Sequence, residues 1–171
     1  MKVLSKISLF LIIFHATINN SFSQGIGFGI SYGTAQVIGG EFVFMSKKNI
    51  FLFGASIQLS NKKGEAVDNQ LPNYGRTVDG EGEYFLTIDL GYGKVIGEKF
   101  TVEVSVSLGQ NYRYTNYIDN RFSSGGYHLV EEENFVGGIG ANIGYMISNN
   151  FNFYLGLNSL KKFQLGARIL F

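Results

Sequence analysis

Residues 100–114 alternate strictly between two kinds of side chain. From Phe100 to Tyr114, every second position carries Phe, Val, Leu, Gln or Tyr, and the positions between carry Thr, Glu, Ser, Gly, Asn or Arg. Successive side chains of a β-strand point to opposite faces, whereas a helix would mix the two sets. The segment is therefore predicted to be one long strand with an apolar face and a polar face.

Seven further segments show the same period of two. They are residues 26–33, 38–45, 51–59, 84–92, 135–145, 151–158 and 163–171. Eight strands in all is an even number, as single-chain bacterial membrane barrels have. The chain has 23 Gly and one Pro, which suits many strands joined by tight turns. We predict an all-β fold, an eight-stranded antiparallel up-and-down β-barrel.

Side-chain volume indicates which face lies inside. The interior of an eight-stranded barrel is only just wide enough for side chains to fill, so the Gly-, Ser- and Asn-rich face fits there. The apolar face then points outward. Aromatic residues stand at strand ends, as Tyr84 and Tyr92 do around Leu86, Ile88 and Leu90. Two membrane interfaces favour such girdles. We therefore predict a transmembrane barrel rather than a soluble barrel that is filled with apolar side chains.

The connections alternate in length. Residues 47–49, 97–99 and 148–150 form three short turns, which would lie on the periplasmic side. The other end has tight turns near 34–36 and 159–162 and two long connections, residues 61–82 and 115–133. These two are predicted to be extracellular loops.

The first 23 residues have the order of a secretory signal peptide. Lys2 and Lys6 precede an apolar run over residues 9–14, and small residues at Ser21 and Ser23 precede Gln24. We expect cleavage near Ser23 and one barrel domain over residues 24–171. The mature part would hold twelve Lys and Arg against thirteen Asp and Glu. A net charge of −1 gives no electrostatic basis for binding nucleic acid.

The final strand, Phe163-Gln-Leu-Gly-Ala-Arg-Ile-Leu-Phe171, ends on an aromatic residue preceded by alternating apolar positions. With the eight-strand pattern, it makes residues 25–171 resemble the small OmpA/OmpX-like outer-membrane β-barrels. The resemblance implies location in the outer membrane of a Gram-negative bacterium, with lipid and lipopolysaccharide as partners. It also implies that Ile169 and Phe171 are read by the barrel-assembly machinery.

Six charged residues fall on the face predicted to line the lumen. They are Glu41, Glu83, Asp89, Glu103, Arg113 and Arg168. Charges inside a barrel must be paired or hydrated. A network of ion pairs and water in place of an apolar core is the expected role of these residues. The alternative is a narrow, low-conductance channel with a net acidic lumen.

Catalytic chemistry has little support in the sequence. The mature chain has one histidine, His128, in the second long connection, near Ser123 and Ser124. Some barrels of the resembled type are lipid A-modifying enzymes with a Ser/His/acid set, but such a set needs rigid mutual orientation. We expect no enzyme, no catalytic residue and no cofactor. One histidine among flexible acids does not make a metal site.

The two long connections are the predicted functional elements, because loops on a rigid scaffold often carry recognition. Tyr, Arg and Phe are frequent in binding hot spots. The candidates of these types, with the single histidine, are Tyr74, Arg76, Tyr117, Arg121, Phe122, Tyr127 and His128. We expect a structural or surface-binding role, with a possible extracellular ligand.

Overall fold

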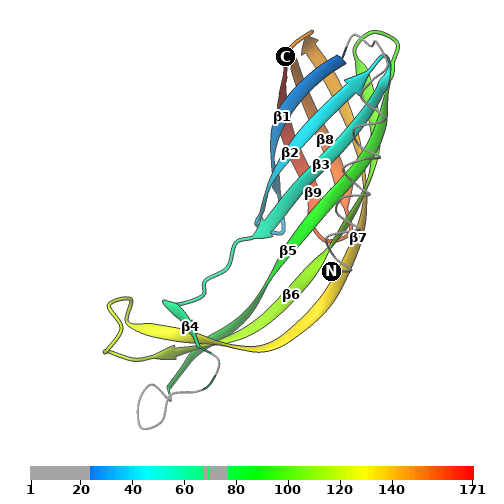
Figure 1. Ribbon diagram of the computed structural model, residues 1–171. Coiled ribbons are helices and arrows are strands. Elements are labelled where there is room, and N and C mark those ends of the chain that lie inside the picture. Colours follow the sequence, from blue (N-terminus) through cyan, green and yellow to red (C-terminus); the bar gives the residue numbers. More distant parts are fainter. Residues whose placement is uncertain (1–23, 68, 70–76) are drawn as a thin grey trace, which may run out of the picture.

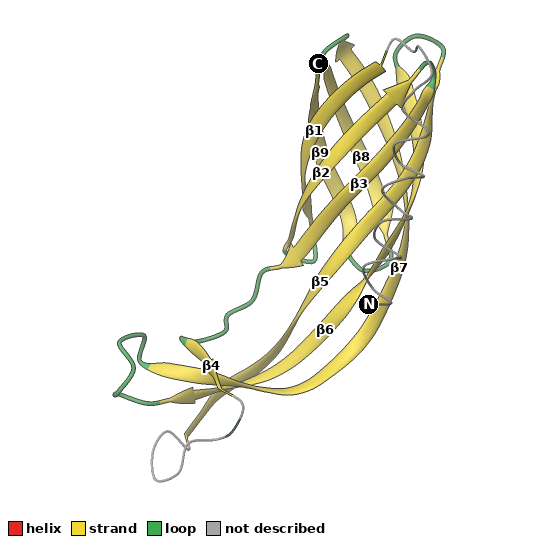
Figure 2. Cartoon of the chain, viewed as in Figure 1, coloured by secondary structure: helices red, strands yellow, loops and turns green. Residues whose placement is uncertain are grey.

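The computed structural model describes residues 24–67, 69 and 77–171 and is built of β-strands and turns (Figures 1 and 2). The strands are β1 (Gln24–Gly33), β2 (Val37–Ser46), β3 (Asn49–Gln58), β4 (Glu65–Val67), β5 (Thr77–Ile96), β6 (Phe100–Ile118), β7 (Gly126–Ser148), β8 (Phe151–Asn158) and β9 (Lys162–Leu170). The predicted signal peptide lies outside the described residues. Over the described residues, no helix has the length and apolarity to cross a membrane.

Eight of these strands close into a ring. The order β7-β6-β5-β3-β2-β1-β9-β8 is completed by pairing between β7 and β8, and every neighbouring pair is antiparallel. The predicted eight-stranded up-and-down barrel is confirmed. Closure satisfies the backbone groups that an open sheet would leave unpaired at its edges.

The two faces of the strands are also as predicted. Outward Ile30 and Val104 are 61% and 58% exposed, whereas inward Glu103 and Ser107 are 1% and 0% exposed. The ring strands β1, β2, β3, β8 and β9 have eight to ten residues. Strands of about this length cross the apolar core of a bilayer when they are tilted.

The hairpin turns are as short as predicted. Gln36, Lys47 and Lys162 adopt positive φ values of 60°, 57° and 63°. Left-handed residues of this kind let a two- or three-residue turn follow the right-handed twist of the strands that it joins.

Within the described residues, the two long connections are only partly loops, and their predicted bounds are wrong. Strands β5, β6 and β7 have 20, 19 and 23 residues and leave the barrel together as a curved three-stranded sheet (Figure 1). Residues 77–82, 115–118 and 126–133 belong to these strands. We call the part of β5–β7 beyond the last β3–β5 pair, Ile57 with Leu86, together with β4, the strand extension. Polar residues occupy both of its faces, and the sequence therefore resembles that of a loop.

Candidate functional site

Arg168 on β9 forms the centre of the barrel interior. Its Nε donates to Glu41 Oε1 on β2 at 2.7 Å, and its Nη2 donates to Glu103 Oε2 on β6 at 2.8 Å. Its Nη1 also contacts Glu103 Oε1. The Tyr154 ring lies 4.0 Å from the guanidinium carbon. The Arg168 cluster (Glu41, Glu103, Tyr154 and Arg168) therefore joins four strands through one buried cation.

Glycine makes room for this cluster. Gly29 on β1 lies between Arg168 and Glu41 in the hydrogen-bonded register. A Cβ atom at Gly29 would stand 2.8 Å from both Arg168 Cγ and Glu41 Oε1. Contacts this short would force the ion pair apart, so the small residue is required for the pairing.

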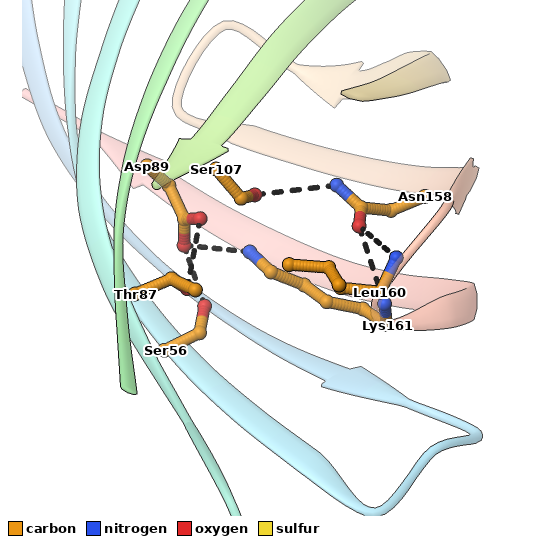
Figure 3. Close-up of polar contacts among 7 residues, drawn as sticks. All are labelled: Ser56, Thr87, Asp89, Ser107, Asn158, Leu160 and Lys161. Carbon is orange, nitrogen blue, oxygen red and sulfur yellow. Dashed lines mark hydrogen bonds and ion pairs between the residues drawn. The ribbon is translucent and has the colours of Figure 1, made fainter. Parts of the chain in front are cut away.

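A second polar cluster lies near the barrel mouth, between Asp89 on β5 and Lys161 in the β8–β9 turn (Figure 3). Lys161 Nζ lies 2.6 Å from Asp89 Oδ2, and the same carboxylate accepts from Ser56 Oγ at 2.5 Å and Thr87 Oγ1 at 3.2 Å. Asn158 Oδ1 accepts from the Lys161 backbone N–H at 3.2 Å and so fixes the turn. The turn lysine is thereby directed into the barrel.

The interior is closed in layers. At the end near the C-terminus, buried Val43, Ile50, Leu52 and Leu170 form an apolar layer. The Arg168 cluster and the Asp89–Lys161 pair follow toward the other end. The cavity lined by Glu41, Asp89 and Lys161 has a volume of about 30 Å³. A polar cavity of this volume has room for water.

The predicted lumen residues separate into two groups. The structure brings Glu41, Glu103 and Arg168 together and places Asp89 beside them, as described above. It places Glu83 and Arg113 outside the barrel, and for these two residues the lumen assignment is wrong. Arg113 has a 53% exposed side chain, 3.7 Å from Glu81 and 3.9 Å from Glu132. Both residues lie beyond the last β3–β5 pair. There the strand face that points inward in the barrel is exposed to solvent.

Lys161 is the interior charge that the sequence reasoning missed. It stands in a tight turn, where the period-two pattern assigns no face. The signal that could have found it is the unpaired charge of Asp89 in the predicted lumen, which requires a cation nearby.

The strand extension has a small aromatic core of its own. Tyr117 on β6 stacks on Tyr127 on β7 with ring centroids 5.2 Å apart, and Phe122 lies 5.6 Å from Tyr127. At its tip, Asp119 accepts from Arg121 Nη2 at 2.6 Å. These hydrogen bonds hold the pKa of Asp119 below its usual value, against the opposing effect of burial.

His128 fastens β4 to this sheet. Its ring Nδ1 lies 2.7 Å from the Lys63 carbonyl oxygen, and its ring packs edge-on against Tyr114 at 5.9 Å. Strand β4 pairs in parallel with residues 127–129 of β7. The Ser124 hydroxyl donates to the Gly126 carbonyl instead of approaching the imidazole. These contacts give His128 a structural role.

Of the predicted binding residues that the structure describes, only Arg121 is exposed. Tyr117, Tyr127 and His128 are buried, and Phe122 is half-buried. Arg121 is exposed but paired with Asp119. The predicted candidates Tyr74 and Arg76 lie outside the described residues. The apolar side chains that the extension does expose include those of Val78 and Ile118.

The remaining predicted sites are placed as follows. Ile169 and Phe171 of the closing segment are both exposed, and the Phe171 backbone N–H donates to the Ile26 carbonyl at 2.8 Å. In the described part of the chain, no three His, Cys, Asp or Glu residues are grouped so that they could hold a metal ion.

Comparisons with known proteins find no matching family model and no matching curated protein. Among solved structures, Neisserial surface protein A is similar at 10% identity and a TM-score of 0.50, over 86% of this chain and 94% of that one. Two others have a TM-score of 0.41. One is Ail, the attachment invasion locus protein of Yersinia pestis, in complex with the heparin analogue sucrose octasulfate (12% identity, 86% of this chain, 92% of that chain). The other is a de novo designed transmembrane β-barrel (11%, 90% and 98%). The chain thus has the fold of the small eight-stranded outer-membrane barrels.

Proposed function

We propose that this chain is an integral outer-membrane protein whose strand extension serves as a rigid surface for binding outside the cell. Residues 1–23 would direct export, and the apolar outer face would contact lipid and lipopolysaccharide. Ile169 and Phe171 would be recognised by the barrel-assembly machinery. The shared barrel fold and the apolar outer face of the strands support a membrane location.

The observation that carries the proposal is the contrast between the closed barrel and the projecting sheet. Strand β5 runs nine residues beyond its last pair with β3. At roughly 3.3 Å per residue, the extension reaches about 30 Å from the barrel. Its aromatic core and the pairing of β4 with β7 brace it, whereas a flexible loop would have to be ordered when it binds.

The orientation of the barrel follows from its two ends. The C-terminus and the short turns between β2 and β3, β5 and β6, and β7 and β8 lie at the end away from the extension (Figure 1). Outer-membrane barrels keep short turns on the periplasmic side, and their longer connections face outward. The extension would therefore stand on the cell surface.

The channel alternative gains no support from the interior. The apolar layer, the Arg168 cluster and the Asp89–Lys161 pair each occupy the lumen, and the cavity that borders both polar clusters has a volume of about 30 Å³. A catalytic role gains none from His128, whose contacts fasten β4. We therefore propose neither transport nor catalysis.

Single cysteine substitutions test whether the strand extension is exposed on the cell surface. The chain has no Cys, so Asn120→Cys at the tip and Asn149→Cys in the β7–β8 turn each introduce one thiol. We expect a membrane-impermeant maleimide to label Asn120→Cys on intact cells and Asn149→Cys only after permeabilisation. Labelling of Asn149→Cys alone on intact cells would reverse the orientation and contradict the proposal.

Conductance in planar bilayers tests the closed interior. We expect no discrete single-channel steps from the purified protein. Reproducible conductance steps that change in size when Lys161 is replaced by Met would show that ions pass the Asp89–Lys161 pair. That result would favour the channel alternative.

A further inference from the structure

A polar cavity of about 450 Å³ lies where the strand extension meets the barrel mouth. Its walls come from the β3–β4 linker at residues 59–61, from β5 at residues 79–83, and from Tyr114 and Asn116 on β6. Asn116 holds the linker in place, because its Oδ1 accepts from the Lys63 backbone N–H at 2.9 Å and its Nδ2 donates to the Asn61 carbonyl at 3.0 Å. The cavity is therefore bounded by fixed elements.

One hydroxyl group in the wall of the cavity, that of Tyr114, has no hydrogen-bond partner among the described residues. Ser60 Oγ is also unpaired among them, but protein atoms cover it and it does not face the cavity. Tyr114 is only 2% exposed, and its hydroxyl lies beside Gly82, 2.5 Å from where a Cβ atom would stand. Tyr114 makes ring contacts with Tyr84 and His128, but its hydroxyl forms no hydrogen bond to another described residue. Buried polar groups are ordinarily paired, so the Tyr114 hydroxyl points to a ligand or ordered water in the cavity.

The charged side chains around the cavity indicate which kind of ligand it would bind. Lys63 is neutralised by its ion pair with Asp79. Among the described residues, the one cation paired with Glu81 is Arg113 at 3.7 Å, which is shared with Glu132. Glu83 accepts one hydrogen bond, from Asn111 Nδ2 at 3.0 Å. Two carboxylates at the cavity thus keep capacity for further donors, and charge-assisted hydrogen bonds are the strong ones.

We infer that this cavity binds a small hydrophilic ligand that carries primary ammonium groups, such as an amino sugar or a polyamine. Glu81 and Glu83 would accept from ammonium groups, and the Tyr114 hydroxyl and the Asn61 side chain would bond to the rest of the ligand. The volume is within the range of small-molecule sites. The inference rests on the proposed function, since it names a ligand class for the base of the surface-exposed extension.

Calorimetric titration of the purified protein in detergent micelles tests the ligand class. The probes are the β-1,4-linked disaccharide of glucosamine, its N-acetylated form as a neutral control of similar shape, and spermidine. We expect saturable binding of at least one amine probe and none of the acetylated disaccharide. Binding of the disaccharide alone identifies an amino sugar site, and binding of spermidine alone identifies a polyamine site.

Variants locate the binding within the protein. Glu81→Gln with Glu83→Gln removes both acceptors, and we expect affinity to fall at least about tenfold. Tyr114→Phe should weaken binding by about threefold to tenfold, which is the usual effect of losing one hydrogen bond. Glu65→Gln with Glu98→Gln, an equal loss of two exposed negative charges outside the cavity, should leave the affinity within about twofold of wild type.

Three results would overturn the inference. They are the absence of binding by either amine probe at millimolar concentration, equal binding of the acetylated disaccharide, and a loss in the Glu65→Gln, Glu98→Gln control as large as in the Glu81→Gln, Glu83→Gln variant. None of these results would change the expected labelling of Asn120→Cys on intact cells. Failure of the ligand inference can therefore be distinguished from failure of the proposed function.

Discussion

Replacing Arg168 by Met should destabilise the barrel strongly. The substitution keeps most of the aliphatic volume but removes the hydrogen bonds to Glu41 and Glu103. Both carboxylates then lose their only described cation in the interior cluster. Removing one partner of a buried pair leaves an uncompensated charge, at a cost of about 3–5 kcal/mol. We expect the free energy of unfolding to fall by that amount.

The two glutamates should not contribute equally to this loss. The side chain of Glu103 is 0% exposed, whereas that of Glu41 is 16% exposed and can recover some hydration. Adding Glu103→Gln to Arg168→Met should therefore restore more stability than adding Glu41→Gln. The difference between the two double variants measures how much of the penalty comes from full burial of the carboxylate.

Unfolding in urea from detergent micelles, followed by far-ultraviolet circular dichroism, provides the measurement. Arg113→Met is the control, because its ion pairs at 3.7 and 3.9 Å are exposed and should contribute less than about 1 kcal/mol. A loss of stability in Arg168→Met that equals the loss in Arg113→Met would refute the structural role of the interior cluster.

Three further predictions concern packing and pH. Tyr127→Ala removes a fully buried ring from the extension and should lower its local stability by about 3–5 kcal/mol, seen as protease cleavage of the extension while the barrel stays intact. Gly29→Val should destabilise the barrel by about 1–3 kcal/mol in the same urea assay, whereas Gly137→Ala, whose nearest new contact is 3.7 Å, should have little effect. The lowered pKa of Asp119 stabilises the tip above the usual carboxyl value, and that contribution is lost as pH falls through the folded pKa. Proteolysis of the tip by an acid protease should therefore increase at low pH in wild type, with no such change in Asp119→Asn.

The barrel could be predicted from sequence because one physical constraint governs every strand in it. Side chains of adjacent strand residues point in opposite directions, so Val104 lies on the outer face and Glu103 in the interior. The outer positions are therefore apolar and the inner positions are small or polar. The strand extension lacks that constraint. Glu83 and Tyr84 are neighbours with water accessible on both faces, so the contrast between polar and apolar positions disappears beyond the barrel.

The interior pairs were predictable only in part. The sequence places Arg168 and Glu41 on the inward face, but their pairing depends on strand register and on the space left by Gly29. The direction of Lys161 depends on a turn held by Asn158. Tyr127 and His128 were predicted as binding candidates in a loop because sequence alone did not show that β6, β7 and β4 pack together around them.

Gel migration of the membrane fraction tests the central claim, a closed barrel inserted in the outer membrane, most directly. We expect the mature protein to fractionate with the outer membrane. It should run as a compact band when unheated and shift after boiling, because the closed ring resists detergent until heat opens it. Recovery as a soluble periplasmic protein with a single band, unchanged by heating, would contradict that claim.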